Sequence, residues 1–207
     1  MNRPLCGLYA ITPETSDTEH LLQQTQAVLA GGACVLQYRS KLADGLLRRT
    51  QAEVLQTLCR RHGVLFIVND DLGLAEAVGA DGVHVGRDDA AVTEARQRLG
   101  RAAVVGASCY DSLERAREAV RAGADYVAFG AVHPSTTKPG APRAPLALFA
   151  AARELGVPRV AIGGIRPDNA AAVVAAGADL LAVVDGVFGA ADPRAAAALL
   201  TGLYPCA

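Results

Sequence analysis

Residues 79–86 read Gly79-Ala80-Asp81-Gly82-Val83-His84-Val85-Gly86, a tight turn followed by a short apolar run. Glycine suits the left-handed position that ends a helix, and alanine is small enough for the chain to turn directly into a strand. The same turn precedes apolar runs at 123–125 and 177–179, and a looser copy, Gly32-Ala33-Cys34, precedes another. The repetition indicates units in which a helix leads into a buried strand. The chemistry is then expected at the opposite ends of the strands.

Eight apolar runs rich in β-branched residues alternate with longer segments of helical period, which is typical of βα units around a parallel sheet. An open doubly wound sheet would usually begin with a glycine-rich phosphate loop, and residues 10–14 do not form one. We therefore predict a single-domain (β/α)8 TIM barrel, of the α/β class, over residues 1–207. The predicted strands are 8–12, 35–39, 65–69, 82–86, 104–108, 126–132, 160–164 and 180–185, and the predicted helices are 19–30, 46–61, 112–122, 146–155, 168–176 and 193–200.

Composition excludes several classes of protein. The chain has 207 residues, of which 51% are hydrophobic and 20% charged, so it is globular and not disordered. A net charge of −1 leaves no positive excess for nucleic acid. The longest uncharged run, residues 21–38, contains four glutamines and a glycine pair, so no transmembrane helix is expected. Because the first residues lack the apolar core of a secretory signal, we expect a cytoplasmic protein without a membrane partner.

Cysteine and lysine usage add two expectations. The five cysteines, an odd number without Cys-x-x-Cys spacing, favour reduced and mostly buried thiols. Only two of the 20 basic residues are lysines, Lys41 and Lys138. Both follow predicted strands, as does Arg39. Three cations around one cavity repel one another unless they bind an anion, and a diphosphate would suit them. The alternative is that each is solvated in a surface loop.

Two aspartates follow consecutive predicted strands. Asp70 and Asp89 can approach each other across one strand spacing, and two adjacent carboxylates repel unless a proton or a cation bridges them. Magnesium uses one or two carboxylates together with substrate phosphates, so a magnesium site is predicted here. Their neighbours Asp71 and Asp88 are explained as acids at helix N-termini. The spacing alone is a weak signal for a metal.

Other strand ends offer phosphate-binding groups but no nucleophile with a base. Residues 135–138, Ser-Thr-Thr-Lys, form a loop rich in hydroxyl donors, and Gly163-Gly164 follows the seventh strand, where barrels often bind phosphate through backbone N–H groups. An exposed polar loop and a tight turn are the alternatives. His84, inside an apolar strand, is read as a satisfied barrel histidine. No base can be assigned to Ser108 or Cys109, so nucleophilic catalysis is not indicated.

In this order, the strand-end motifs resemble those of the thiamine phosphate synthase (thiamine-phosphate pyrophosphorylase) family over residues 8–200. The resemblance implies a (β/α) barrel that joins hydroxymethylpyrimidine diphosphate to hydroxyethylthiazole phosphate, releasing diphosphate and forming thiamine phosphate. The segments that carry it are Gln37-Tyr38-Arg39-Ser40-Lys41, Asn69-Asp70, Gly82-Val83-His84-Val85-Gly86, Ser135-Thr136-Thr137-Lys138-Pro139 and Ala161-Ile162-Gly163-Gly164-Ile165.

The resemblance also implies roles for single residues. The two small-molecule substrates would be the partners, and Mg²⁺, held by Asp70 and Asp89, the cofactor. Arg39, Lys41, Ser108 and Lys138 would be catalytic. The expected contacts to the pyrimidine diphosphate are Gln37, Arg39, Lys41, Asn69, Ser108 and Lys138, with Tyr38 and Ser40 of the same motif as further substrate contacts. The expected contacts to the thiazole phosphate are Ser135, Thr136, Thr137, Gly164, Val184 and Asp185.

Two residues depart from the family pattern, and three other functions stay open. Asp185 stands where the family usually has serine, and Arg87 replaces a commonly neutral residue.

A thiazole tautomerase would share the barrel without needing the pyrimidine diphosphate contacts. A Schiff-base aldolase would need a desolvated lysine inside the barrel, whereas both lysines lie in predicted loops. A phosphate-ligand binder without activity is the third alternative. The sequence does not disclose the oligomeric state, so a homo-oligomer is also open.

Overall fold

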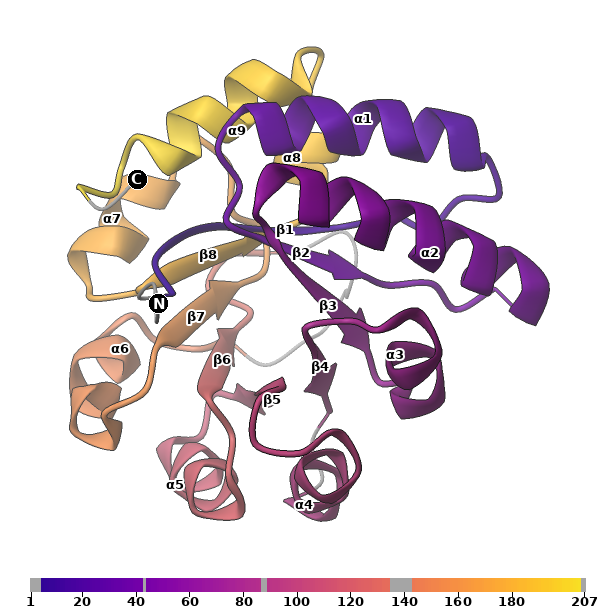
Figure 1. Cartoon of the computed structure of the whole chain (residues 1–207). Helices are drawn as coiled ribbons and strands as arrows, with labels where there is room; N and C mark the ends of the chain where they lie inside the picture. Colours follow the sequence, from indigo (N-terminus) through magenta and orange to yellow (C-terminus); the bar gives the residue numbers. More distant parts are fainter. Residues whose placement is uncertain (1–4, 43, 87–88, 135–142, 206–207) are drawn as a thin grey trace.

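Eight parallel strands close into a barrel in sequence order, with β1 between β2 and β8 (Figure 1). The computed structural model describes residues 5–42, 44–86, 89–134 and 143–205. The predicted (β/α)8 barrel is confirmed, and each predicted strand is present. The strands are β1 (Gly7–Ile11), β2 (Val35–Tyr38), β3 (Leu65–Asn69), β4 (Gly82–Val85), β5 (Val104–Tyr110), β6 (Tyr126–Gly130), β7 (Arg159–Ile162) and β8 (Leu180–Val183).

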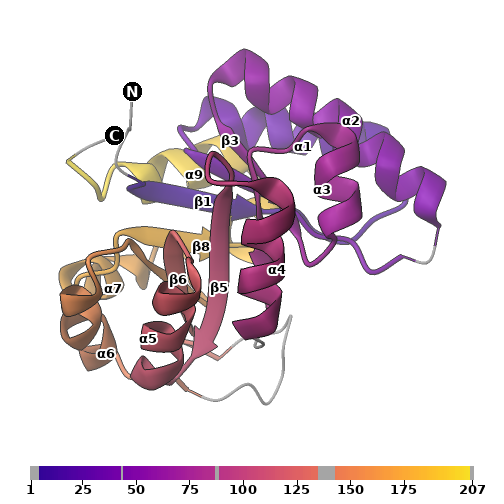
Figure 2. The same ribbon diagram turned by 60° about the horizontal axis from the view of Figure 1, so that its bottom comes forward.

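Helices cover the outside of the barrel (Figure 2). They are α1 (Thr18–Ala30), α2 (Gly45–His62), α3 (Leu72–Val78), α4 (Asp89–Leu99), α5 (Leu113–Ala122), α6 (Ala147–Ala151) with the 3-10 turn η1 (Ala152–Leu155), α7 (Ala170–Ala175), α8 (Asp185–Phe188) and α9 (Pro193–Thr201). Of these, α3, α4 and α8 are not among the six helical ranges given above, although Asp71 and Asp88 were read as acids at helix N-termini. In the described part of the chain, no helix has the length and apolar character needed to cross a membrane.

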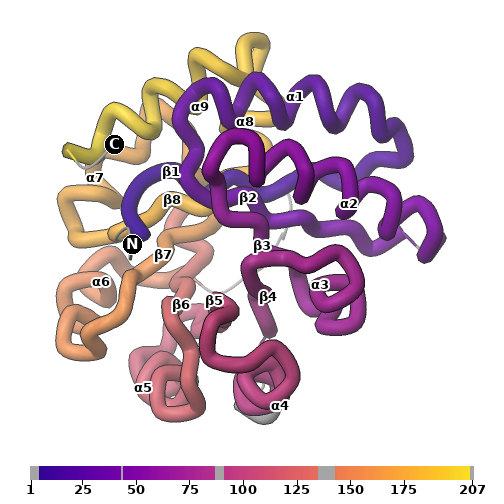
Figure 3. Tube along the Cα trace, viewed as in Figure 1, coloured from indigo at the N-terminus to yellow at the C-terminus, as the bar shows by residue number. Residues whose placement is uncertain are grey.

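The first and last helices pack side by side and complete the outer ring (Figure 3). Their close approach depends on Gly31, which follows α1. A Cβ atom at this position would lie 2.6 Å from the Cβ of Ala197 in α9 and 2.5 Å from the carbonyl oxygen of Arg194. Any larger residue would therefore push α9 away from α1.

Alternation along the strands separates two cores. Leu8 and Ala10 of β1 face outward and pack with the helices, whereas Tyr9 and Ile11 face into the barrel. The inner cluster fills the inside of the barrel, and part of it forms the wall of the cavity described below. Its buried members are Tyr9, Ile11, Val35, Ile67, Tyr126, Ala128, Val160, Leu180 and Ala182.

Each Gly-Ala-Asp turn ties an even-numbered strand to the strand before it. The carboxylate of Asp81 accepts a hydrogen bond from the backbone N–H of Phe66 (2.8 Å), and Asp125 does the same for Val105 (2.7 Å). In the looser fourth copy, the backbone N–H of Cys34 donates to the carbonyl oxygen of Leu8 (2.9 Å). The turns are thus structural and lie at the amino ends of the strands, as predicted.

The third turn carries a nearly buried ion pair. Asp179 accepts from the backbone N–H of Arg159 (2.8 Å) and from its guanidinium Nε (2.7 Å) and Nη2 (2.9 Å). Arg159 is only 9% exposed, and its Nη1 donates to the carbonyl oxygen of Phe149 (3.0 Å). Each nitrogen of the guanidinium therefore has a hydrogen-bond partner in its own chain.

Among the described residues, three cysteines follow the expectation and one does not. Cys34, Cys59 and Cys109 are not in disulfides, and burial raises the pKa of Cys59 to about 12. Cys6 is disulfide-bonded, so the expectation of reduced thiols is wrong at this residue. Spacing along the sequence does not reveal a pairing that the fold brings about.

We predict that Asp179→Ala lowers the free energy of unfolding by about 3 kcal/mol, because it leaves the buried guanidinium of Arg159 without its counter-ion. Urea unfolding of the purified variant measures the loss. The matched control is Glu53→Ala, which removes an exposed partner of Arg49 and should cost less than about 0.5 kcal/mol. Equal losses in the two variants would contradict the prediction.

Candidate active site

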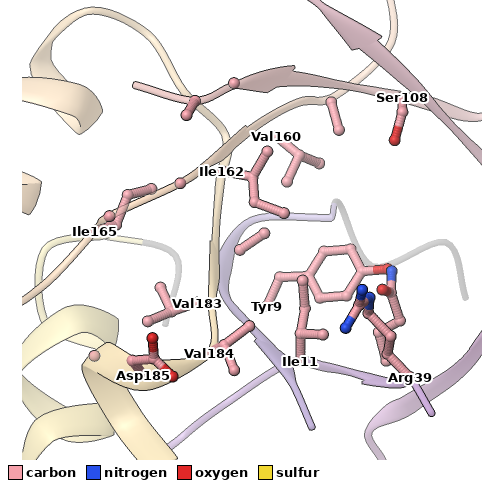
Figure 4. Close-up of a pocket in the computed structure, with 18 of the residues that line it drawn as sticks. Tyr9, Ile11, Arg39, Ser108, Val160, Ile162, Ile165, Val183, Val184 and Asp185 are labelled. Atoms are coloured by element: carbon pink, nitrogen blue, oxygen red, sulfur yellow. The ribbon is translucent and has the colours of Figure 1, made fainter. Parts of the chain in front are cut away.

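A cavity of about 200 Å³ opens at the carboxyl ends of the strands. Two kinds of side chain line it, and Figure 4 shows them on opposite sides, with Arg39 and Ser108 on one and Ile165 and Val183 on the other. The polar side comes from β2 to β5 and the segments directly after them, and consists of Gln37, Arg39, Asn69, His84, Ser108 and Tyr110. The apolar side comes chiefly from β7, β8 and β1.

The backbone of Arg39 is clamped at the polar side. Its N–H donates to Oγ1 of the buried Thr12 (2.9 Å), and the same hydroxyl lies 3.4 Å from its carbonyl oxygen. Thr12 in turn donates its own N–H to the carbonyl oxygen of Gln37 (3.0 Å). Because Gln37 and Arg39 are two residues apart on an extended segment, both lie on the cavity side, as the alternation predicts. Arg39 therefore brings a positive charge to the cavity on a backbone that hydrogen bonds hold in place.

Asp70 adopts a left-handed backbone conformation at the end of β3, with φ 60°. Its N–H donates to the carbonyl oxygen of His84 (2.9 Å), and its Oδ2 accepts from Asn69 Nδ2 (2.7 Å). Its Oδ1 faces the end of β4, where Gly86 has no side chain to intervene. A left-handed backbone conformation costs a non-glycine residue about 1–2 kcal/mol. The conformation that directs this exposed carboxylate therefore lowers the stability of the fold.

The loop after β7 exposes its backbone at the apolar side. Gly163 and Gly164 have φ values of 104° and 62°, and a Cβ on Gly164 would lie 2.2 Å from the carbonyl oxygen of Pro134. Asn169 holds the loop, because its Nδ2 donates to the carbonyl oxygen of Gly164 (3.0 Å) and its Oδ1 accepts from the N–H of Arg166 (2.8 Å). Val184 and Asp185 line the same side, at the start of α8.

A row of hydrogen bonds links four residues of the cavity wall through the buried Tyr126. Gln37 Nε2 donates to the hydroxyl of Tyr9 (2.7 Å), which lies 2.8 Å from that of Tyr126. The Tyr126 hydroxyl contacts Nδ1 of His84 (3.0 Å), and Nε2 of His84 contacts the hydroxyl of Ser108 (2.9 Å). We call these five residues the hydrogen-bond relay. Burial raises the pKa of both tyrosines above their ordinary value, so both phenols stay neutral.

The relay bears on two expectations from the sequence. His84 is a satisfied barrel histidine, as predicted, but it also supplies the imidazole partner of Ser108 that sequence reasoning missed. A serine beside a histidine is the arrangement of nucleophilic catalysis, which usually has a carboxylate on the second ring nitrogen. Here that nitrogen contacts a neutral phenol, the hydroxyl of Tyr126.

Three residues of the motif after β2 lie away from the cavity wall. The side chain of Tyr38 belongs to the outer core, where its hydroxyl donates to Oε1 of Gln51 in α2 (2.8 Å). The expectation that this side chain contacts substrate is wrong, because alternation turns it away from Gln37 and Arg39. Ser40 is half-buried, and its hydroxyl accepts from the N–H of Leu42 (3.3 Å). Lys41 is exposed, with its N–H donating to Glu14 (2.9 Å).

Several predicted site residues cannot be assessed from the structure. Ser135, Thr136, Thr137 and Lys138 lie outside the described residues, as do Arg87 and Asp88. Asp89 begins α4, but its side chain is not described. Among the described side chains there is no group of three or more His, Cys, Asp or Glu residues suited to a metal. A magnesium ion that takes most of its ligands from substrate phosphates and water does not need such a group.

Sequence reasoning missed two further residues of the cavity wall. Tyr110 follows a bulge in β5, has a φ of 56° and lines the polar side. A bulge changes the direction of the side chains after it, and no pattern in the sequence announced one here. Arg166 lines the apolar side, where its guanidinium meets the exposed carboxylate of Asp168 at 3.2 Å. Its position in the sequence, two residues after Gly163-Gly164, could have indicated that Arg166 belongs to the cavity wall.

Known proteins share both the sequence and the fold. A family model described as thiamine monophosphate synthase matches residues 8–187. A thiamine-phosphate synthase of Chromobacterium violaceum is 59% identical over 96% of this chain and 96% of its own length, and one of Thioalkalivibrio sulfidiphilus is 57% identical over 97% and 96%. A solved thiamine phosphate pyrophosphorylase of Pyrococcus furiosus has 35% identity and a TM-score of 0.84, covering 97% of this chain and 96% of its own.

More distant barrels share the fold alone. A 3-hexulose-6-phosphate synthase structure is 24% identical, with a TM-score of 0.69, and covers 95% of this chain. An identity this low shows a shared barrel fold and no more, whereas the higher identities given above show membership of a family. With the family model matching most of the barrel and the relatives spanning nearly its whole length, the chain belongs to the thiamine monophosphate synthase family.

Proposed function

We propose that the protein is a magnesium-dependent thiamine phosphate synthase that transfers the hydroxymethylpyrimidine methylene group from its diphosphate to the nitrogen of hydroxyethylthiazole phosphate. The products are thiamine phosphate and diphosphate. The observation that carries the proposal is the division of one cavity into a polar, cationic side and an apolar side whose wall includes the Gly163-Gly164 backbone. Such a cavity suits two substrates of different chemistry. Family membership supports the same reaction.

The polar side would bind the pyrimidine diphosphate. Arg39 can pair with phosphate oxygens through its planar guanidinium, and its clamped backbone limits the freedom lost on binding. Gln37, Asn69 and Ser108 add hydrogen-bonding groups to the same wall. Lys41 and Lys138 would reach the diphosphate from the loops after β2 and β6. These cations would stabilise the leaving diphosphate more than the bound ground state, because charge concentrates on it as it departs.

Asp70 and Asp89 would hold the magnesium ion. Both are hard oxygen donors, and the directed carboxylate of Asp70 faces the end of β4, from which the chain leads to α4. When bound, magnesium supplies charge neutralisation at the diphosphate oxygens. Asn69, through its hydrogen bond to Asp70, keeps one carboxylate oxygen in place for that task.

The apolar side would bind the thiazole phosphate. The apolar wall would accept the thiazole ring, and the backbone of Gly164 and of residues 184–185 would hold the phosphate, with Ser135, Thr136 and Thr137 contributing hydroxyl groups. The carboxylate of Asp185 is exposed at this side and would repel a phosphate. Arg166, across the same wall, carries the opposite charge and would offset it.

The reaction needs no protein nucleophile. The bond between the methylene carbon and the diphosphate oxygen breaks, and its electron pair leaves with diphosphate. The electron-rich aminopyrimidine stabilises the methylene cation, and the lone pair of the thiazole nitrogen then forms the new C–N bond. The protein's contribution is to orient the two substrates and to stabilise the departing anion.

The deciding experiment incubates the purified protein with both substrates and magnesium. We expect diphosphate release that matches thiamine phosphate formation one to one, requires the thiazole phosphate and stops when a chelator removes the metal. Enzymatic detection of diphosphate measures it. Full turnover in the presence of excess chelator would contradict the magnesium assignment. Tautomerisation of thiazole phosphate without diphosphate release would favour the isomerase alternative.

Arg39→Ala should lower kcat by about 100-fold, because it removes the guanidinium that stabilises the departing diphosphate. Arg39→Lys should recover only part of the loss, since an ammonium cannot donate two parallel hydrogen bonds. Steady-state kinetics of both variants provide the test, with Arg153→Ala on the exposed 3-10 turn as the control. A turnover number equal to that of the unmodified protein in Arg39→Ala would remove this residue from the mechanism.

Asp185→Ser tests the charge at the apolar side. The KM for thiazole phosphate should stay unchanged or fall, because the substitution removes a negative charge beside the phosphate. The KM for the pyrimidine diphosphate should not change. A rise in the thiazole phosphate KM would show that the carboxylate has a positive role in binding.

A further inference from the structure

The hydrogen-bond relay joins both ends of the polar wall through residues that are far apart in the sequence. Gln37 of β2 and Ser108 of β5 both line the cavity, and Tyr9, Tyr126 and His84 connect them through four contacts of 2.7–3.0 Å. Tyr9 and Tyr126 are each only 2% exposed and His84 is 8% exposed. The hydrogen bonds of the two tyrosine hydroxyls are therefore shielded from water, and the low polarity around them strengthens them.

The relay has a direction. The Gln37 amide nitrogen can only donate, so the Tyr9 oxygen accepts from it, and the Tyr126 oxygen is the acceptor that satisfies the buried hydroxyl hydrogen of Tyr9. Tyr126 must then donate its hydrogen to Nδ1 of His84. A neutral imidazole with an accepting Nδ1 carries its hydrogen on Nε2, which donates to the Ser108 oxygen. Because every hydroxyl has one hydrogen, reversing the link between Tyr9 and Tyr126 would also reverse the links from Tyr126 through His84 to Ser108.

The direction of the relay determines whether Ser108 and Gln37, its two ends, present a hydrogen-bond donor or an acceptor to a ligand. The hydroxyl hydrogen of Ser108 is directed to an acceptor in the cavity, since its oxygen already accepts from His84. The Gln37 amide has its nitrogen toward Tyr9, which leaves Oε1 as the acceptor it can offer. A diphosphate consists of acceptors, and an aminopyrimidine carries an amino donor. With the opposite direction, Ser108 would present a lone pair to a phosphate oxygen, and the two would repel.

We propose that Tyr9, Tyr126 and His84 are positioning residues that set Ser108 as a hydrogen-bond donor and Gln37 as an acceptor toward the pyrimidine diphosphate. The inference rests on the proposed function for the identity of the ligand. It also gives the Ser108–His84 pair a task other than nucleophile activation, because His84 donates to Ser108 and cannot take its proton in this tautomer.

Tyr126 provides the sharpest test, because it lies in the middle of the relay and is not part of the cavity wall. Its ring lies over Gly106 of β5, where a Cβ atom would come within 1.9 Å of the ring, and stacks on His84 at a centroid distance of 5.6 Å. Tyr126→Phe keeps this packing and removes one hydroxyl. The matched control is Tyr204→Phe, which removes a buried hydroxyl bonded to the carbonyl oxygen of Ala178.

The first measurement is the tautomer of His84 in the unmodified, ligand-free protein. Nitrogen NMR of histidine-labelled protein distinguishes a hydrogen on Nε2 from one on Nδ1, and His84→Gln assigns the signal by its loss. We expect the hydrogen on Nε2. A hydrogen on Nδ1 would overturn the proposal, because the relay would then run from Ser108 to Gln37. This measurement does not depend on how any relay variant folds.

The second measurement is the kinetics of Tyr126→Phe. We expect kcat/KM for the pyrimidine diphosphate to fall about tenfold, the cost of one misdirected hydrogen bond, with the KM for thiazole phosphate unchanged and a second His84 tautomer in the spectrum. Tyr204→Phe should change none of these. Unchanged kinetics in Tyr126→Phe, or an equal loss in both variants, would overturn the proposal. If the unmodified protein releases no diphosphate, the proposed function fails, while the His84 tautomer still decides the relay.

Discussion

A closed parallel barrel brings the carboxyl end of every strand to the same mouth, and the rest of this structure depends on that constraint. Residues from β2, β3, β4 and β5 are distant in sequence, yet their strand ends form one polar wall because neighbouring strands pair in register. The Gly-Ala-Asp turns maintain the register from the other end, where each aspartate ties two strands together. Stability and chemistry thus occupy opposite ends of the barrel.

The strands could be predicted from sequence because each is an apolar run, and four of them also follow a Gly-Ala-Asp turn or its looser copy. The helices were less predictable. Helix α3 has seven residues and α8 has four, too few for a hydrophobic period to stand out. A capping residue was the better signal for α3, because Asp71, already read as an acid at a helix start, accepts from the N–H of Leu74 (2.9 Å) and caps it.

The position of a site residue could be predicted from sequence only where the local backbone geometry determines it. Alternation correctly put Gln37 and Arg39 on one face, but the resemblance alone could not tell that Tyr38 points to the outer core. The contact between Tyr9 and Tyr126 joins residues 117 positions apart, and no local pattern encodes such a pairing. One signal was present, since a tyrosine at an inward strand position needs a partner for its hydroxyl when buried.

The hydrogen-bond relay also carries an energetic cost, the desolvation of its buried polar groups. Apolar side chains of similar volume would fill the barrel without the desolvation penalty that buried hydroxyl, amide and imidazole groups carry. The fold accepts that penalty within a core that is otherwise apolar, and it satisfies each group with the next one in the row. A purely structural core gains nothing from a row of hydrogen bonds that begins and ends at a cavity wall. A binding site does, because the polarity of a ligand contact can then be set by neighbouring side chains, one of which, Tyr126, is not part of the cavity wall.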